Sequence, residues 1–163
     1  MMERPVANRK WQMAELVCCL LVVISSPGCR TAPPLPPADL QQPGWVVREG
    51  QAVWRTKREA PEIAGEVLVA THSDGRALVQ FTKNPFPLVI AQITTTGWQI
   101  ELPSQNKRYS GRGKPPTRLI WFYLPRALSG GPLPKEWSWH SAENSGWRLE
   151  NWRTGEMIEG FFN

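Results

Sequence analysis

The two histidines are the side chains best suited to acid–base or metal chemistry, yet their surroundings favour neither. His72 precedes the turn-forming segment 73–75, and His140 lies in a tryptophan-rich segment near the end of the chain. A zinc site needs closely spaced histidines or additional cysteines, and neither pattern is present. The chain also lacks a G-x-S-x-G segment, which places a nucleophilic serine on a strand–helix turn. The sequence therefore predicts no metal site and no catalytic triad with a recognisable motif.

Two further patterns have only a superficial likeness to catalytic motifs. Glu156 and Glu159 are three residues apart, so on a strand their carboxylates would point to opposite faces. The segment 111–114, Gly-Arg-Gly-Lys, lacks the full spacing of a phosphate-binding loop. We interpret it as a flexible basic loop. The expectation is a protein without an enzyme active site or a cofactor.

A run of basic residues without any acid occupies residues 107–118. Its members are Lys107, Arg108, Arg112, Lys114 and Arg118. Such a run can contact anionic lipid headgroups, at about 1 kcal/mol per charge, or it can be a solvated loop. No amphipathic helix adjoins it, which favours the solvated loop. The formal net charge of +5 is too small to indicate nucleic-acid binding, and no nucleic-acid partner is expected.

The first 28 residues have the composition of an export signal. Arg4, Arg9 and Lys10 give a basic start, and residues 16–24 form an unbroken apolar run. As a helix this run is about 14 Å long, half the ~30 Å thickness of a bilayer's hydrocarbon core. It is therefore expected to be a cleaved signal rather than a permanent membrane span.

The segment 26–29, Ser-Pro-Gly-Cys, resembles a lipobox, the cleavage signal of bacterial lipoproteins. This resemblance implies cleavage before Cys29 and a diacylglyceryl group on its sulfur, which anchors the protein to a membrane. Arg30 follows the cysteine where some inner-membrane lipoproteins have Asp, which favours the outer membrane, facing the periplasm. Cys18 and Cys19 would leave with the signal, so the mature chain could form no internal disulfide.

Domain organisation follows from these features. Residues 1–28 are the predicted signal peptide, residues 29–44 the lipidated cysteine and a proline-rich tether, and residues 45–163 one folded domain. The tether is expected to be extended and to lift the domain off the membrane.

Alternation of apolar and polar residues in the domain predicts short strands joined by tight turns, that is, an antiparallel, mainly β fold. A short helix is expected near Trp45, and one longer helix at residues 117–128, capped by Thr117 and ended by Pro125. The strands are expected at residues 52–57, 66–71, 76–82, 88–96, 98–102, 137–141, 147–152 and 156–162. Residues 103–118 are expected to form a polar loop.

Eight of the nine tryptophans lie in the domain. They are Trp45, Trp54, Trp98, Trp121, Trp137, Trp139, Trp147 and Trp152. Most are expected to pack in a core, and the others are candidates for lining an apolar cavity.

Residues 78–134 resemble the LolA/LolB-like lipoprotein-localisation family. The likeness consists of the strand at 78–82, the Lys-Asn-Pro-Phe segment at 83–86, two further strands, the helix region and its ending at 124–130. It implies a curved, open antiparallel sheet, a half-barrel, with one or two helices covering its concave side. The cavity between them would bind acyl chains. Phe86 matches the family's protruding apolar tip, although it could equally fold back into the core.

The lipobox and the family resemblance predict two alternative functions from different classes. The first is a non-enzymatic, membrane-anchored monomer that binds lipid or acylated lipoprotein and assists lipoprotein localisation to the outer membrane. The second is a structural or interaction lipoprotein that binds a protein or glycan in the cell envelope. The pattern does not decide which candidate cavity residues face the cavity rather than the other side of the sheet. These candidates are Trp54, Val67, Val69, Leu78, Phe81, Ile90, Trp98 and Ile100.

Overall fold

The computed structural model describes residues 33–141 and 146–163. The predicted signal peptide and Cys29 lie outside the described residues, so cleavage and lipidation stay predictions. Among the described residues, no helix has both the length and the apolar character needed to cross a membrane.

Nine antiparallel strands form one open sheet in the order β6-β5-β4-β3-β2-β1-β9-β8-β7. The strands are β1 (Trp45–Arg55), β2 (Ile63–His72), β3 (Ala77–Lys83), β4 (Phe86–Ile93), β5 (Gly97–Leu102), β6 (Lys107–Arg112), β7 (Trp137–Ser141), β8 (Gly146–Asn151) and β9 (Met157–Phe162). The strand β1 joins the N-terminal and C-terminal strands of the sheet, because it pairs with β2 on one side and with β9 on the other. The expected antiparallel, mainly β fold is thus confirmed.

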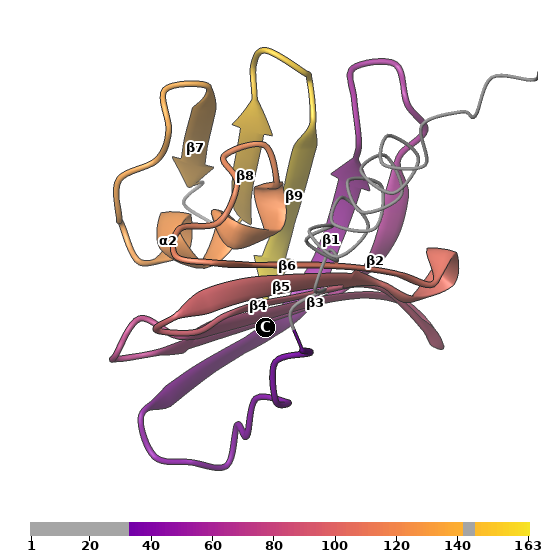
Figure 1. The fold of residues 1–163 in the computed structure, drawn as a ribbon. Helices are drawn as coiled ribbons and strands as arrows, with labels where there is room; N and C mark the ends of the chain where they lie inside the picture. Colours follow the sequence, from indigo (N-terminus) through magenta and orange to yellow (C-terminus); the bar gives the residue numbers. More distant parts are fainter. Residues whose placement is uncertain (1–32, 142–145) are drawn as a thin grey trace, which may run out of the picture. The chain divides into compact units, whose positions relative to one another are not determined.

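Alternation along the strands gives the sheet an inner face, which packs on the core, and an outer face. In β3, Val79 and Phe81 are buried on the inner face, whereas Leu78 and Gln80 lie on the outer face. In Figure 1, the strands β3–β6 are seen nearly edge-on. The helical segments (orange) lie on one side of them, and the chain before β1 (indigo) lies on the other side.

The predicted helix at 117–128 is replaced by two shorter elements, the 3₁₀ helix η2 (Ile120–Phe122) and the helix α2 (Leu124–Leu128). Pro125 explains the break. Proline fits the first turn of a helix, where its missing N–H needs no partner, but it disrupts a helix interior. Accordingly, it lies in the first turn of α2. Thr117 is not a cap; its carbonyl oxygen accepts a hydrogen bond from Trp137 Nε1, at 2.7 Å.

Two other expectations are wrong. The strand β1 begins at Trp45, where a short helix was expected, and runs on for 11 residues. The predicted polar loop contains the 3₁₀ helix η1 (Pro103–Gln105) and the strand β6. The pairing of β6 uses backbone groups, and its side chains are mostly exposed, so its sequence lacks the alternation that marks a half-buried strand.

The chain before β1 is not a free spacer along its described length. Residues 33–39 have no regular secondary structure, but they contact the outer face of the sheet. The Leu35 N–H donates a hydrogen bond to Gln99 Oε1 at 2.8 Å, and Gln92 Nε2 donates one to the Pro36 carbonyl at 3.0 Å. The predicted tether is therefore attached to the domain from Leu35 onward.

Candidate ligand-binding site

The residues predicted to line a cavity divide between the two faces of the sheet. On the inner face are Trp54, Val67, Val69, Phe81, Trp98 and Ile100. Leu78 and Ile90 are on the outer face, because they alternate with the buried residues Val79 and Val89. The prediction that all eight residues could line one cavity is therefore wrong for Leu78 and Ile90.

Aromatic rings of the protein itself occupy the inner face. The Trp121 ring centroid lies 5.0 Å from that of Trp54 and 5.3 Å from that of Phe81. The Phe122 ring meets Trp98 edge-on at 5.4 Å. Phe81 is fully buried, and Trp121 is 2% exposed. In the described part of the chain, the segment η2–α2 therefore fills the place where the sequence predicted an acyl-chain cavity.

An open cleft of about 870 Å³ lies instead on the outer face, across β3, β2, β1, β9, β8 and β7. Its outer-face side chains are Gln51, Val53, Ala64, Glu66, Thr82, His140, Arg148, Glu159 and Phe161. Volumes of 300–1,000 Å³ are typical of ligand sites. No local sequence pattern indicates this cleft, because its residues are dispersed over six strands.

The paired strands β1 and β9 form part of the floor of this cleft. Gly160 lies there opposite Ala52, and a Cβ at residue 160 would come within 2.2 Å of the Gln51 carbonyl oxygen. Only glycine allows β1 and β9 to approach this closely. Ala52 is buried in the core, so residues 52 and 160 are inner-face positions and the outer-face cleft meets only their backbone.

The cleft combines apolar surface with a charged rim. Val53, Ala64 and Phe161 supply the apolar part, and Phe161 is 46% exposed. Arg148 donates hydrogen bonds to Glu150 at 2.7 Å and to Glu159 at 3.2 Å. The bond to Glu150 is the main cause that raises the pKa of the guanidinium. Such a surface suits an amphipathic ligand, whose apolar chain lies on the floor and whose polar end meets the rim.

Neither histidine belongs to a metal-binding group. The His72 ring packs edge-on against Trp45, and its Nδ1 lies 2.8 Å from the Asp74 carboxylate. His140 is exposed at the rim of the cleft. Within residues 33–141 and 146–163, no three metal-ligating side chains come together.

Phe86 is the first residue of β4 and follows the β3–β4 turn. It is 69% exposed, the largest exposure among the large hydrophobic side chains described. Its ring therefore projects into solvent and does not fold back into the core. Whether this ring touches a membrane or a partner stays a prediction.

Comparison with protein-family models and with curated proteins gave no match for this chain. The resemblance to the LolA/LolB-like family therefore stays a prediction.

Proposed function

We propose that this protein is a non-enzymatic, membrane-anchored lipoprotein that binds the acyl chain of a lipid or an acylated lipoprotein. In this role it assists lipoprotein localisation to the outer membrane. The observation that carries the proposal is the outer-face cleft, with its apolar floor and charged rim. Burial of an acyl chain there would contribute about 25 cal/mol per Å² of apolar surface. The aromatic filling of the inner face makes the cleft the better place for the ligand.

Replacing Ala64 with tryptophan is expected to abolish the binding of a fluorescent fatty-acid probe. Ala64 is exposed on the outer face of β2, opposite Val53, so the larger ring would occupy the cleft without entering the core. A tenfold or greater rise in the probe's Kd, measured by fluorescence titration, is the expected result.

The matched control is Ser73→Trp, which adds an exposed ring in the β2–β3 turn, away from the cleft. This variant should bind the probe like the unaltered protein. If Ala64→Trp also binds normally while circular dichroism reports an intact fold, the cleft is not the acyl site.

Replacing Phe86 with glutamate is expected to leave the melting temperature nearly unchanged, because this ring is mostly exposed. If the ring enters the membrane, a charge there should slow the transfer of an acylated peptide to vesicles several-fold. Transfer is followed by fluorescence, with Phe86→Leu as the control that preserves an apolar tip. Equal rates for the Glu and Leu variants would rule out the tip's role.

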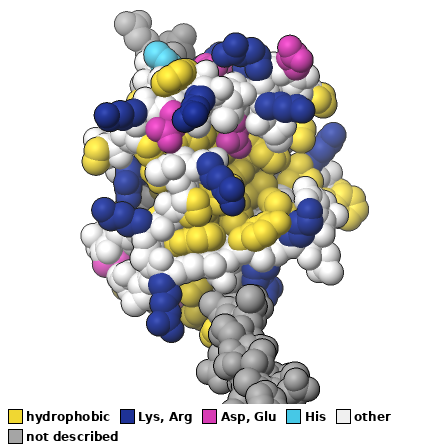
Figure 2. Space-filling view, turned by 45° about the horizontal axis from the view of Figure 1, so that its top comes forward, with side chains coloured by type: hydrophobic (Ala, Val, Ile, Leu, Met, Phe, Trp, Pro, Cys, Tyr) yellow, Lys and Arg dark blue, Asp and Glu magenta, His cyan; other side chains and the backbone are white. Residues whose placement is uncertain are grey.

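A second candidate, an interaction lipoprotein without an acyl ligand, is favoured by the filled inner face. Figure 2 adds an area of apolar side chains with charged side chains, mostly Lys and Arg, around it, and apolar patches with a polar rim are typical of interaction surfaces. Failure of the unaltered protein to bind the fatty-acid probe would leave this candidate as the better one.

A further inference from the structure

We propose that the edge of the sheet formed by β6 lies against an anionic membrane surface, to which the N-terminal lipid holds the protein. This inference rests on the lipidation of Cys29 that the proposed function assumes. It adds the face of the domain that meets the membrane and the lipid chemistry that this face recognises.

The first step is the attachment of the N-terminal segment to the sheet. Besides the two hydrogen bonds at Leu35 and Pro36, the carbonyl oxygen of Pro43 lies 3.1 Å from His72 Nε2. Leu35, Ala38 and Leu40 are half-buried, as expected for a segment that is packed on the sheet. The point at which the anchor leaves the domain is therefore Leu35, not Trp45.

The second step is the length of chain that remains. Only five residues separate Cys29 from Leu35. Because a fully extended chain spans at most about 3.5 Å per residue, the lipidated sulfur lies within roughly 20–25 Å of Leu35, whatever conformation these residues adopt. A membrane that holds the lipid must then pass close to the part of the sheet on which Leu35 rests.

The third step identifies that part. Gln99, which accepts the hydrogen bond from Leu35, is in β5 and pairs with Ser110 at the centre of β6. Side chains two residues apart on a strand share a face, so Arg108 and Arg112 lie on the same outer face as Gln99 and Ser110. The anchor therefore leaves the domain next to the basic strand.

The fourth step is the chemistry of this surface. Arg112 is exposed on the outer face of β6, Lys107 is exposed on the other face of this edge strand, and Lys114 and Arg118 are exposed after the strand ends. Residues 107–118 include no acid. Arg108 is also exposed, but its guanidinium pairs with the Glu101 carboxylate at 2.9 Å. Lysine and arginine close to a membrane are attracted by anionic headgroups. The basic run interpreted from sequence as a solvated loop is thus an edge strand and its continuation, beside the exit of the anchor.

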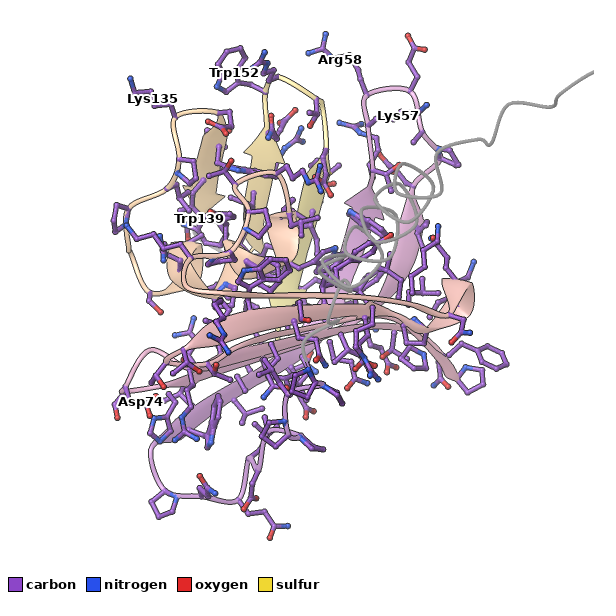
Figure 3. All side chains as sticks on the ribbon, viewed as in Figure 1. Lys57, Arg58, Asp74, Lys135, Trp139 and Trp152 are labelled. Carbon is purple, nitrogen blue, oxygen red and sulfur yellow. The ribbon has the colours of Figure 1, made fainter. Side chains whose placement is uncertain are left out.

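The experiment uses the full lipidated chain reconstituted into vesicles of phosphatidylcholine, with or without phosphatidylglycerol. A polarity-sensitive fluorophore is attached to Lys114→Cys or, as the control, to Lys57→Cys in the β1–β2 loop. Lys57 is exposed, and Figure 3 shows it beside Arg58 at one extremity of the molecule. A quencher on the lipid headgroup reports the proximity of each fluorophore to the membrane.

With phosphatidylglycerol present, the fluorophore at residue 114 should be quenched at least several-fold more than the one at residue 57. Added salt should reduce this difference. The combined change Lys107→Gln, Arg112→Gln and Arg118→Gln should abolish it. The matched set Arg48→Gln, Lys135→Gln and Arg153→Gln removes three exposed charges elsewhere and should preserve it.

Equal quenching at the two sites, or quenching that phosphatidylglycerol does not alter, would overturn the proposal. Fluorophore incorporation at Cys29 in the chain without an introduced cysteine would show that the thiol is free, and it would overturn the assumed anchor as well. Fatty-acid binding in the cleft is measured separately, so the proposed function and this orientation can fail independently.

Discussion

Replacing Trp121 with alanine is expected to lower the free energy of unfolding by about 3–5 kcal/mol, the usual cost of deleting a buried large aromatic side chain. Trp121 is 2% exposed, and its ring contacts both Trp54 and Phe81. It comes from η2, a 3₁₀ helix of three residues, which contributes little stability of its own. The packing of this ring therefore holds the segment η2–α2 on the inner face.

The matched control is Trp152→Ala. Trp152 is 61% exposed, and Figure 3 shows it at an extremity of the molecule, near Lys135, whose carbonyl oxygen accepts its Nε1–H. Its replacement should cost less than about 1 kcal/mol. Urea denaturation followed by circular dichroism measures both variants. A similar small loss in both would show that the ring of Trp121 is not a main support of the core.

Much of the sheet could be predicted from the sequence because alternation is a local signal. Residues 66–71 and 76–82, separated by Asp74-Gly75, have the pattern of a hairpin, and β2 and β3 form it. The Gly75 φ of +91° explains the glycine in the turn. By contrast, β6 has little alternation to detect, because a solvent-exposed edge strand buries few of its side chains.

The candidate site could not be predicted in the same way, because it depends on non-local geometry. The sequence indicated which residues were apolar enough to line a cavity, and six of the eight do share the inner face. No sequence pattern indicated that the rings of Trp121 and Phe122 would pack against these residues and fill the space beside them. The outer-face cleft is lined by six strands, and their order and register are not visible in any local sequence pattern.

The electrostatic surroundings of Glu156 could not be predicted from the sequence either. The sequence presented it as one member of an acid pair with Glu159, but the two residues differ in their surroundings. Glu156 precedes β9, and its Oε1 accepts a hydrogen bond from Trp54 Nε1 at 3.3 Å. Glu159 instead pairs with Arg148 on the outer face. Burial, only partly offset by the bond from Trp54, raises the pKa of Glu156 from 4.5 to about 7.

This shift makes the stability of the protein depend on pH, and its direction follows from proton binding. Between about pH 4.5 and 7, the folded protein keeps a proton on Glu156 that the unfolded chain releases. The free energy of unfolding therefore has its full value below pH 4.5 and decreases as pH rises through about 7. For this group the total decrease is about 3 kcal/mol, from 1.36 kcal/mol per pKa unit.

Replacing Glu156 with glutamine is expected to remove this dependence. The amide oxygen can still accept the hydrogen bond from Trp54 Nε1, and the amide carries no charge to desolvate. The variant should match the unaltered protein near pH 4 and exceed its free energy of unfolding by up to about 3 kcal/mol at pH 8. Urea denaturation at a series of pH values gives the difference between the two proteins, in which the contributions of other titrating groups cancel.

Glu59→Gln is the matched control, because Glu59 is exposed in the β1–β2 loop and the substitution removes the same charge. Its stability curve should run parallel to that of the unaltered protein over the whole pH range. If the Glu156→Gln curve runs parallel as well, the Glu156 carboxylate is solvated and its proton is not coupled to folding. A separation that grows between pH 4.5 and 7.5 would instead show that burial keeps this carboxyl group protonated in the folded protein.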